Sequence, residues 1–158
     1  MSELARPSFL FVCMGNICRS PTVEAVARIE FAKAGLDLQV ASAGTEDYHI
    51  GNGADPRAVA SAEARGYPLA AHRARQVSRD DFTRSDHLLV MDRANERALR
   101  TLAPPEHHAR IALFLPFAGV TDAVELPDPY HGSRADFEHA LDLACAGIAA
   151  LARRLAGS

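Results

Sequence analysis

Long apolar runs, basic clusters and internal repeats are all missing from this sequence. The longest apolar stretches, 8–14 and 144–151, fall far short of the roughly 18–20 residues that cross a bilayer, which excludes a transmembrane helix. The longest basic run is Arg153-Arg154 and the formal charge is −3, so the basic footprint of a nucleic-acid-binding protein is absent. Without repeats or low-complexity linkers, residues 1–158 are expected to form one domain.

Cysteine is scarce and odd in number. The chain has three cysteines, and residues 1–7 lack the layout of a signal peptide. Both features indicate a reducing compartment, where a cysteine is more often a packed apolar residue or a reactive thiol than half of a structural disulfide. We therefore expect a cytoplasmic protein.

Short apolar runs alternate with segments that carry helix start signals. The apolar runs are typical of strands in a parallel sheet, and they lie at 9–12, 38–43, 87–91 and 111–114. The helix start signals are Ser20-Pro21, Asp55-Pro56, Ser78 with Asp81, and Ser133 with Asp136, with one further helix predicted at 94–102. This alternation predicts an α/β fold, a three-layer sandwich of a four-stranded parallel sheet with helices on both faces. Ligands bind such sheets at the carboxyl ends of the strands.

The first predicted strand runs into a loop with the composition of an anion site. This loop is Cys13-Met14-Gly15-Asn16-Ile17-Cys18-Arg19-Ser20. With Ser20 as the predicted N-cap, the loop lies over a helix N-terminus, whose free amides and dipole attract an anion. Gly15 and Asn16 tolerate the positive φ that turns N–H groups inward. Because Arg19 can grip two phosphate oxygens at once, residues 13–20 are predicted to bind a phosphate dianion and are called the phosphate loop below.

Cys13 at the base of this loop is predicted to be a nucleophile. The loop amides, the helix N-terminus and Arg19 all favour a thiolate over a thiol. The Ser20 hydroxyl is close enough in sequence to hydrogen-bond that thiolate while also capping the helix. The alternative is a buried strand-end thiol without a chemical role.

With these motifs the sequence resembles the low-molecular-weight protein tyrosine phosphatases over essentially its whole length. Five motifs carry the resemblance in the family's order, at 12–21, 42–45, 72–76, 91–93 and 128–130. The resemblance implies hydrolysis of phosphotyrosine and small aryl phosphates through a cysteinyl-phosphate intermediate. It implies no metal and no cofactor. The expected partners are phosphotyrosine-containing proteins and a cognate tyrosine kinase.

The resemblance also implies a role for each matching residue. Cys13 is the nucleophile, and Arg19 with the loop amides holds the phosphate. Asp128 protonates the leaving oxygen and then activates water. Cys18 is a redox partner that forms a reversible bond with Cys13 under oxidation.

Further residues are implied around the loop. Ser42 and His72, together with Asn16, support its conformation through hydrogen bonds. Tyr48 and Tyr130 form aromatic walls beside an aryl phosphate. Ile17 stands where relatives resembling protein-arginine phosphatases have threonine, which favours phosphotyrosine as the substrate.

Two alternatives stay open. One is an arsenate reductase-like enzyme of the same fold, which would pass electrons through further cysteines, although 80–92 contains none. The other is a non-catalytic module that binds phosphate or a phosphopeptide, although Cys13, Arg19 and Asp128 are all retained. The sequence departs from the family pattern at His131, which replaces a second tyrosine or a glycine, and at Ala94, where serine is usual.

Overall fold

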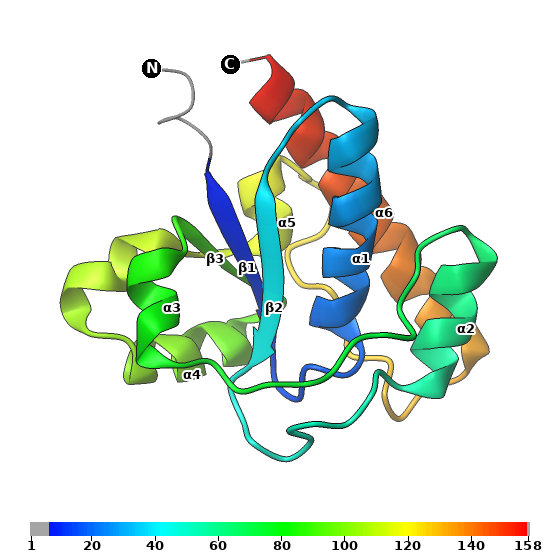
Figure 1. Ribbon diagram of the computed structural model, residues 1–158, viewed down its shortest axis with the longest axis horizontal. Coiled ribbons are helices and arrows are strands. Elements are labelled where there is room, and N and C mark those ends of the chain that lie inside the picture. The colour runs from blue at the N-terminus through cyan, green and yellow to red at the C-terminus, as the bar shows by residue number, and fades with distance from the viewer. Residues whose placement is uncertain (1–6, 158) are drawn as a thin grey trace.

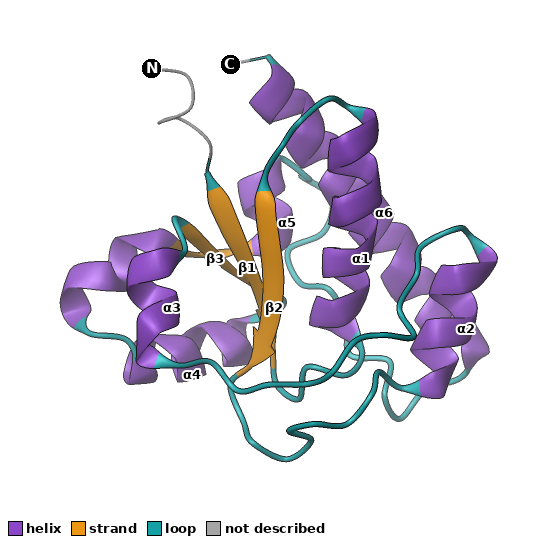
Figure 2. Ribbon diagram, in the orientation of Figure 1, coloured by secondary structure: helices purple, strands orange, loops and turns teal. Residues whose placement is uncertain are grey.

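The computed structural model describes residues 7–157 and has a parallel sheet at its centre. The strands, in the order β2-β1-β3-β4, are β1 (Ser8–Cys13), β2 (Gln39–Gly44), β3 (His87–Val90) and β4 (Ile111–Leu113). Helices cover both faces of the sheet (Figure 1, Figure 2). The predicted α/β sandwich is therefore confirmed. The expectation that residues 1–7 are not a signal peptide concerns residues 1–6, which lie outside the described part of the chain.

Two layers of helices enclose the sheet. The helices are α1 (Arg19–Lys33), α2 (Pro56–Ala64), α3 (Arg79–Arg84), α4 (Arg93–Leu102), α5 (Phe114–Ala118) and α6 (Arg134–Ala156). On one face lie α1, α5 and α6, and on the other lie α3 and α4 (Figure 1). Helix α2 packs against α1 and α6, farther from the strands.

Strand β1 is buried on both sides, which explains its continuous apolar run. Phe9 and Phe11 belong to the larger core beneath α1, α5 and α6. Leu10 and Val12 point the other way, into a second core beneath α3 and α4. This alternation is the two-residue period of a strand.

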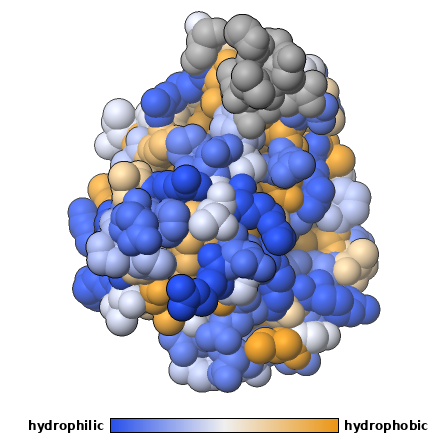
Figure 3. Space-filling model, turned by 60° about the vertical axis from the view of Figure 1, so that its left-hand side comes forward, coloured by the Kyte–Doolittle hydropathy of each residue, from blue (hydrophilic) through white to orange (hydrophobic). Residues whose placement is uncertain are grey.

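The side of the molecule that carries α3 and α4 presents a largely hydrophilic surface with small, separate hydrophobic patches (Figure 3). Such scattered apolar residues are ordinary for a protein surface. Within residues 7–157, no helix combines the length and the apolar character that crossing a bilayer requires.

Helix starts follow the predicted signals at three places. Asp55 caps α2 with its side chain. Ser78 with Asp81, and Ser133 with Asp136, form capping boxes at α3 and α6. In each box the serine and the acidic residue three positions later satisfy each other's free backbone N–H groups, which fixes where the helix begins.

The predicted N-cap of α1 is wrong. The helix begins at Arg19 with Cys18 at the N-cap, so Ser20 already lies in the first turn, and no side chain caps this end. The Ser20 hydroxyl instead lies 3.0 Å from the Cys13 sulfur and accepts a hydrogen bond from the Asn16 side chain at 2.9 Å. Because Ser20 lies inside the first turn, its hydroxyl does not cap the helix and serves the phosphate loop instead.

Two short helices have no counterpart in the sequence prediction. Helix α5 begins at Phe114, where the prediction continued the fourth strand, and a 3₁₀ helix occupies Pro105–Arg110. Helices of five or six residues complete at most two turns. They are therefore too short to show a hydrophobic period in the sequence.

Gly147 lets α6 approach α5 closely. A Cβ atom at this position would lie 2.5 Å from Cζ of Phe114 and 3.0 Å from Cδ2 of Leu115. Both neighbours are buried, so neither can swing into solvent. The glycine in the middle of this helix is therefore explained by packing.

We expect Gly147→Ala to lower the free energy of unfolding by about 1–3 kcal/mol, because the added methyl overpacks the core. A glycine-to-alanine change inside a helix would otherwise be stabilising by about 1 kcal/mol. Urea denaturation measures the difference. Ala146→Gly, at the exposed neighbouring position, reports helix propensity alone and should cost about 1 kcal/mol. A Gly147→Ala protein more stable than the parent would contradict this packing account.

Candidate active site

The phosphate loop follows β1 and is supported by the end of the neighbouring strand, β2. It follows β1, and the end of β2 runs directly beside it through hydrogen bonds from Thr45 N–H to Cys13 O (2.9 Å) and from Glu46 N–H to Met14 O (3.0 Å). A Cβ atom on Gly44 would lie only 2.6 Å from Met14 O. Glycine at position 44 is thus what permits the backbone of β2 to support the loop this closely.

Asn16 holds the shape of the loop. It is fully buried and has φ of 58°, the left-handed region that side-chain-bearing residues rarely adopt. Its side-chain amide donates to the hydroxyls of Ser20 (2.9 Å) and Ser42 (3.0 Å), and its side-chain oxygen accepts from Arg75 N–H (3.0 Å). His72 Nε2 lies 2.7 Å from the Asn16 carbonyl. The structure therefore brings the predicted support residues Ser42 and His72 to Asn16.

The Cys13 sulfur lies at the floor of the loop and is surrounded by hydrogen-bond donors. The side chain is buried, Asn16 N–H donates to the sulfur at 3.3 Å, and the Ser20 hydroxyl lies 3.0 Å away. Since Ser20 accepts a hydrogen bond from Asn16, its own proton is available to a thiolate, which can only accept. These contacts stabilise negative charge on sulfur.

Arg19 is held in one orientation by groups on two other segments. Its NH1 donates to Asp92 Oδ2 (2.7 Å) and to the Leu126 carbonyl (3.0 Å). The other oxygen of Asp92 accepts from Asn95 N–H at 2.8 Å and so caps α4. One carboxylate thus fixes both a helix start and the guanidinium group, which leaves Arg19 preorganised for an anion.

Asp128 lies near Arg19 on the segment before α6. Asp128 Oδ2 is 3.7 Å from NH2 of Arg19, and Tyr130 N–H donates to Asp128 Oδ1 at 3.1 Å. The Asp128 side chain is 39% exposed, so it reaches solvent while facing the loop. A carboxyl group in this position can exchange protons with both a bound substrate and water.

A cavity of about 200 Å³ opens over the phosphate loop. Tyr48 and His49 line one part of its wall, and Asp128, Tyr130 and His131 line another. Ring centroids lie 6.5 Å apart between His49 and Tyr130, and 4.9 Å apart between Tyr130 and His131. The cavity therefore has aromatic rings around an anion-binding site at its floor. This shape suits a flat aryl phosphate.

Cys18 has different surroundings from Cys13 although both belong to the phosphate loop. Burial raises the pKa of the Cys18 thiol, and the nearby Asp55 carboxylate raises it further. Cys18 is therefore a protonated thiol at neutral pH. No disulfide joins the cysteines of the described residues.

Within the described part of the chain, no group of three or more His, Cys, Asp or Glu side chains is arranged to hold a metal ion. The adjacent histidines His107 and His108 lie in the 3₁₀ helix Pro105–Arg110. His108 Nε2 contacts the carbonyl of Ala103 at 3.0 Å, so its ring has a structural partner.

Residues 8–158 match the family model of the low molecular weight phosphotyrosine protein phosphatases. The chain belongs to this family. A low molecular weight protein-tyrosine-phosphatase from Streptomyces coelicolor is 44% identical over 138 residues, which cover 84% of each chain. The human low molecular weight phosphotyrosine protein phosphatase is 38% identical over 142 residues, covering 87% of this chain and 89% of that one. A crystal structure of an Entamoeba histolytica protein tyrosine phosphatase has a TM-score of 0.89 at 33% identity, covering 94% of this chain and 96% of that one.

As a low molecular weight protein-tyrosine phosphatase, the chain is a hydrolase whose substrates are phosphoproteins. The sequence did not single out every residue at its site. Three residues of the site were assigned no role from the sequence. Asp92 lies beside Arg19, and the cavity is lined by His49 and His131. For Asp92 a signal existed, because it follows β3, the strand beside β1, and so lies at the same sheet edge as the phosphate loop.

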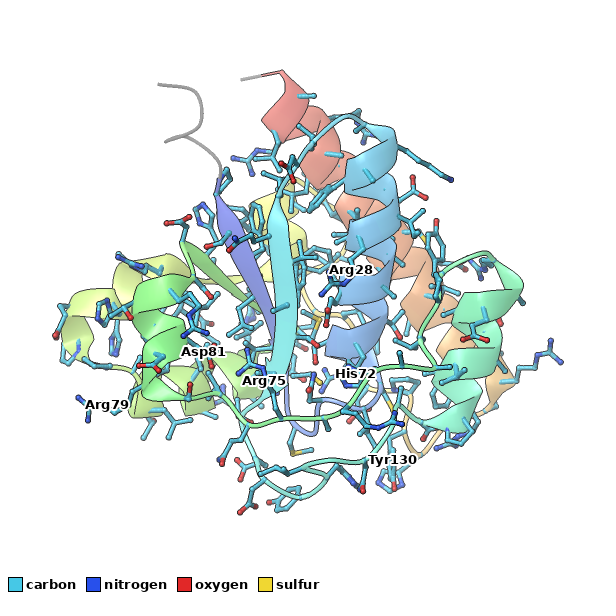
Figure 4. The ribbon with its side chains drawn as sticks, viewed as in Figure 1. Arg28, His72, Arg75, Arg79, Asp81 and Tyr130 are labelled. Carbon is cyan, nitrogen blue, oxygen red and sulfur yellow. The ribbon has the colours of Figure 1, made fainter. Side chains whose placement is uncertain are left out.

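The segment that reaches Asn16 is itself anchored to α3. The Arg75 guanidinium donates to both oxygens of Asp81 at 3.0 Å, and the two side chains meet beside β2 (Figure 4). Burial alone would raise the pKa of Asp81, but the hydrogen bonds from Arg75 and Ser78 outweigh it and lower the pKa. His72 and Arg75 are thus carried to the loop by one segment fixed at an ion pair.

This pair predicts a pH-dependent stability. Because the pKa of Asp81 is lower in the folded protein than its ordinary value of about 3.9, its stabilisation is present above that value and is lost as pH falls through the folded pKa. Asp81→Asn has no carboxylate to protonate, so its free energy of unfolding should fall less than that of the parent between about pH 5 and about pH 2. Urea titrations at several pH values measure this. Equal acid sensitivity of both proteins would contradict the assignment.

Proposed function

We propose that this phosphatase hydrolyses phosphotyrosine in two steps, through a phosphate ester on the Cys13 sulfur. The observation that carries the proposal is the placement of that sulfur. It accepts the Asn16 N–H at 3.3 Å and lies at the floor of a cavity that Arg19 also lines. A nucleophile below an anion site meets the phosphorus of any phosphate bound there.

In the first step, the Cys13 thiolate attacks phosphorus while Asp128 donates a proton to the tyrosine oxygen. Arg19 and the amides of the phosphate loop hold the three equatorial oxygens, whose charge they balance in the transition state. Tyrosine is a poor leaving group as a phenolate, so protonation by a positioned carboxyl group contributes substantially to the rate. Asp128 Oδ2 lies 3.7 Å from Arg19 NH2, and this supports the proposal because a phosphate held by Arg19 would have its leaving oxygen near the Asp128 carboxyl group.

In the second step, Asp128 has become a carboxylate and removes a proton from a water molecule. That water attacks phosphorus and the Cys13 thiolate leaves. The Ser20 hydroxyl and the Asn16 N–H stabilise the departing sulfur, as they stabilise it before attack. The same groups therefore serve both half-reactions.

Substrate choice follows from the walls of the cavity. Tyr48 and Tyr130 offer aromatic faces to a phosphotyrosine ring. A phosphoserine side chain is too short to bring its phosphate to the floor while its backbone stays outside. Ile17, which also lines the cavity, supports an aryl rather than a guanidinium substrate because it offers no polar group.

We further propose a cognate tyrosine kinase as a partner and the cytoplasm as the compartment. A free Cys13 thiolate beside the Cys18 thiol requires reducing conditions. Under oxidation, Cys18 is proposed to form the reversible bond that protects Cys13.

The proposal is tested by hydrolysis of phenyl phosphate with a metal chelator present. We expect turnover that is insensitive to chelator, that Cys13→Ser abolishes, and that Asp128→Asn lowers by about 10²-fold or more. His139→Ala is a control on α6, because His139 does not line the cavity, and it should retain full activity.

A folded parent protein that binds inorganic phosphate without turning over phenyl phosphate would contradict this mechanism. The phosphate loop would then serve recognition only. Activity retained in Cys13→Ser would equally remove Cys13 as the nucleophile.

A further inference from the structure

Arg57 connects the start of α2 to the segment that carries Asp128. Its side chain makes two hydrogen bonds to the Asp55 carboxylate, from Nε at 3.0 Å and from NH2 at 2.8 Å. The same NH2 donates to the carbonyl of Tyr130 at 3.0 Å. Tyr130 is two residues from Asp128, and it lies at the end of the sheet that holds the phosphate loop (Figure 4). Arg57 therefore bridges two segments that are distant in sequence.

The Asp55 end of this bridge is fixed to the phosphate loop. Asp55 N–H donates to the Ile17 carbonyl at 2.8 Å, and the Asp55 side chain is 7% exposed. Its carboxylate also accepts the backbone N–H of Arg57 at 2.9 Å, as the cap of α2. The Tyr130 carbonyl, which Arg57 binds, is therefore positioned relative to Ile17 and the rest of the phosphate loop.

The other end of the bridge holds both the backbone and the ring of Tyr130. Besides the carbonyl hydrogen bond, the guanidinium carbon lies 5.6 Å from the Tyr130 ring centroid and 4.6 Å from that of Phe137. Phe137 is buried in α6, so it provides a fixed surface against which the guanidinium stacks. Tyr130 N–H in turn donates to Asp128 Oδ1 at 3.1 Å.

The Asp128 segment has few other restraints, namely the burial of Pro129 and the 3.7 Å approach of Arg19 NH2 to Asp128 Oδ2. Within the described part of the chain, Arg57 makes the one hydrogen bond that reaches the backbone of 127–131 from another element. Asp128 and Tyr130 are both more than one-third exposed, so packing restrains them weakly. A guanidinium that binds a carboxylate, a carbonyl and two rings is a strong restraint by comparison.

We propose that Arg57 is a positioning residue for the proton transfer by Asp128. By tying Tyr130 to Asp55, it sets the distance between Asp128 and the oxygen of the leaving group above Cys13. The proposal rests on the role of Asp128 given under Proposed function. The effect is expected to be visible in the first half-reaction when the leaving group is a strong base and needs the proton from Asp128.

The variant Arg57→Met tests this. Methionine keeps an apolar stem against Phe137 and removes the side-chain hydrogen bonds to Asp55 and Tyr130, while the backbone N–H of residue 57 can still cap α2 through Asp55. kcat/KM contains the step in which the phenol leaves, so it is compared for phenyl phosphate, which needs the acid, and for p-nitrophenyl phosphate, which needs it far less. We expect about a tenfold loss for phenyl phosphate and less than about a threefold loss for p-nitrophenyl phosphate, since a small displacement of a catalytic group costs that much.

A double-mutant cycle makes the test specific. If Arg57 acts through Asp128, Arg57→Met should have no further effect on phenyl phosphate hydrolysis in an Asp128→Asn background. Arg57→Lys should resemble Arg57→Met, because an ammonium group cannot make the forked contact. Inhibition by inorganic phosphate should be unchanged in all these variants, which shows that the phosphate loop is intact and the protein folded.

Arg65→Met is the matched control. Arg65 follows α2 and pairs with Glu138 (2.6 Å) and Asp142 (2.7 Å) on α6, so it links the same two helices without touching Asp128 or Tyr130. It should leave the ratio of the two substrates unchanged. Equal losses on both substrates, or equal losses with and without Asp128, would overturn the role of Arg57. If Asp128→Asn itself left phenyl phosphate hydrolysis intact, the proposed function would fail first.

Discussion

The left-handed backbone of Asn16 is the constraint on which the site depends. This conformation is costly for a residue with a side chain, about 1–3 kcal/mol. It persists because the side chain and carbonyl of Asn16 are bound on all sides, by Ser20, Ser42, His72 and Arg75. The result is a backbone turn that directs an N–H group at the Cys13 sulfur. The buried side-chain amide of Asn16 therefore fixes the shape of the loop and the surroundings of Cys13, the proposed nucleophile.

The parallel sheet explains why residues so far apart in sequence meet there. Cys13 lies opposite Gly44 in the register of β1 and β2, and Val12 lies opposite Val90 in that of β1 and β3. The three strands thus end together: the last residues of β1 and β2 are Cys13, the proposed nucleophile, and Gly44, which allows close approach, and Asp92 follows the end of β3. Asp128 and Tyr130 come from the segment before α6, outside the sheet, and together with Tyr48 they are among the exposed members of the site. In the proposed mechanism, the rigid part of the site binds the phosphate group, and the more exposed part contacts the leaving group.

Much of this arrangement could be predicted from local signals. The buried strand of β1, the capping boxes of α3 and α6, and the anion-binding character of the phosphate loop each depend on neighbours within a few residues. Ser20 misled the prediction because a serine before a proline suits an N-cap, and nothing local shows that its hydroxyl is needed by Cys13 and Asn16 instead. Asp92 and Arg57 act on partners 73 residues away, Arg19 and Tyr130. Contacts of that range leave no periodic signal, so the position of Asp92 after β3 indicates only its sheet edge, and its contact with Arg19 and that of Arg57 with Tyr130 come from the structure.

The most direct test of the account is to trap the covalent intermediate. The parent protein is mixed with phenyl phosphate, quenched rapidly in acid, digested and analysed by mass spectrometry. The account predicts one additional phosphoryl group on the peptide that contains Cys13, with none on Cys18. Hydrolysis that proceeds at full rate while Cys13 remains unmodified at every quench time, or a phosphoryl group on another residue, would contradict it.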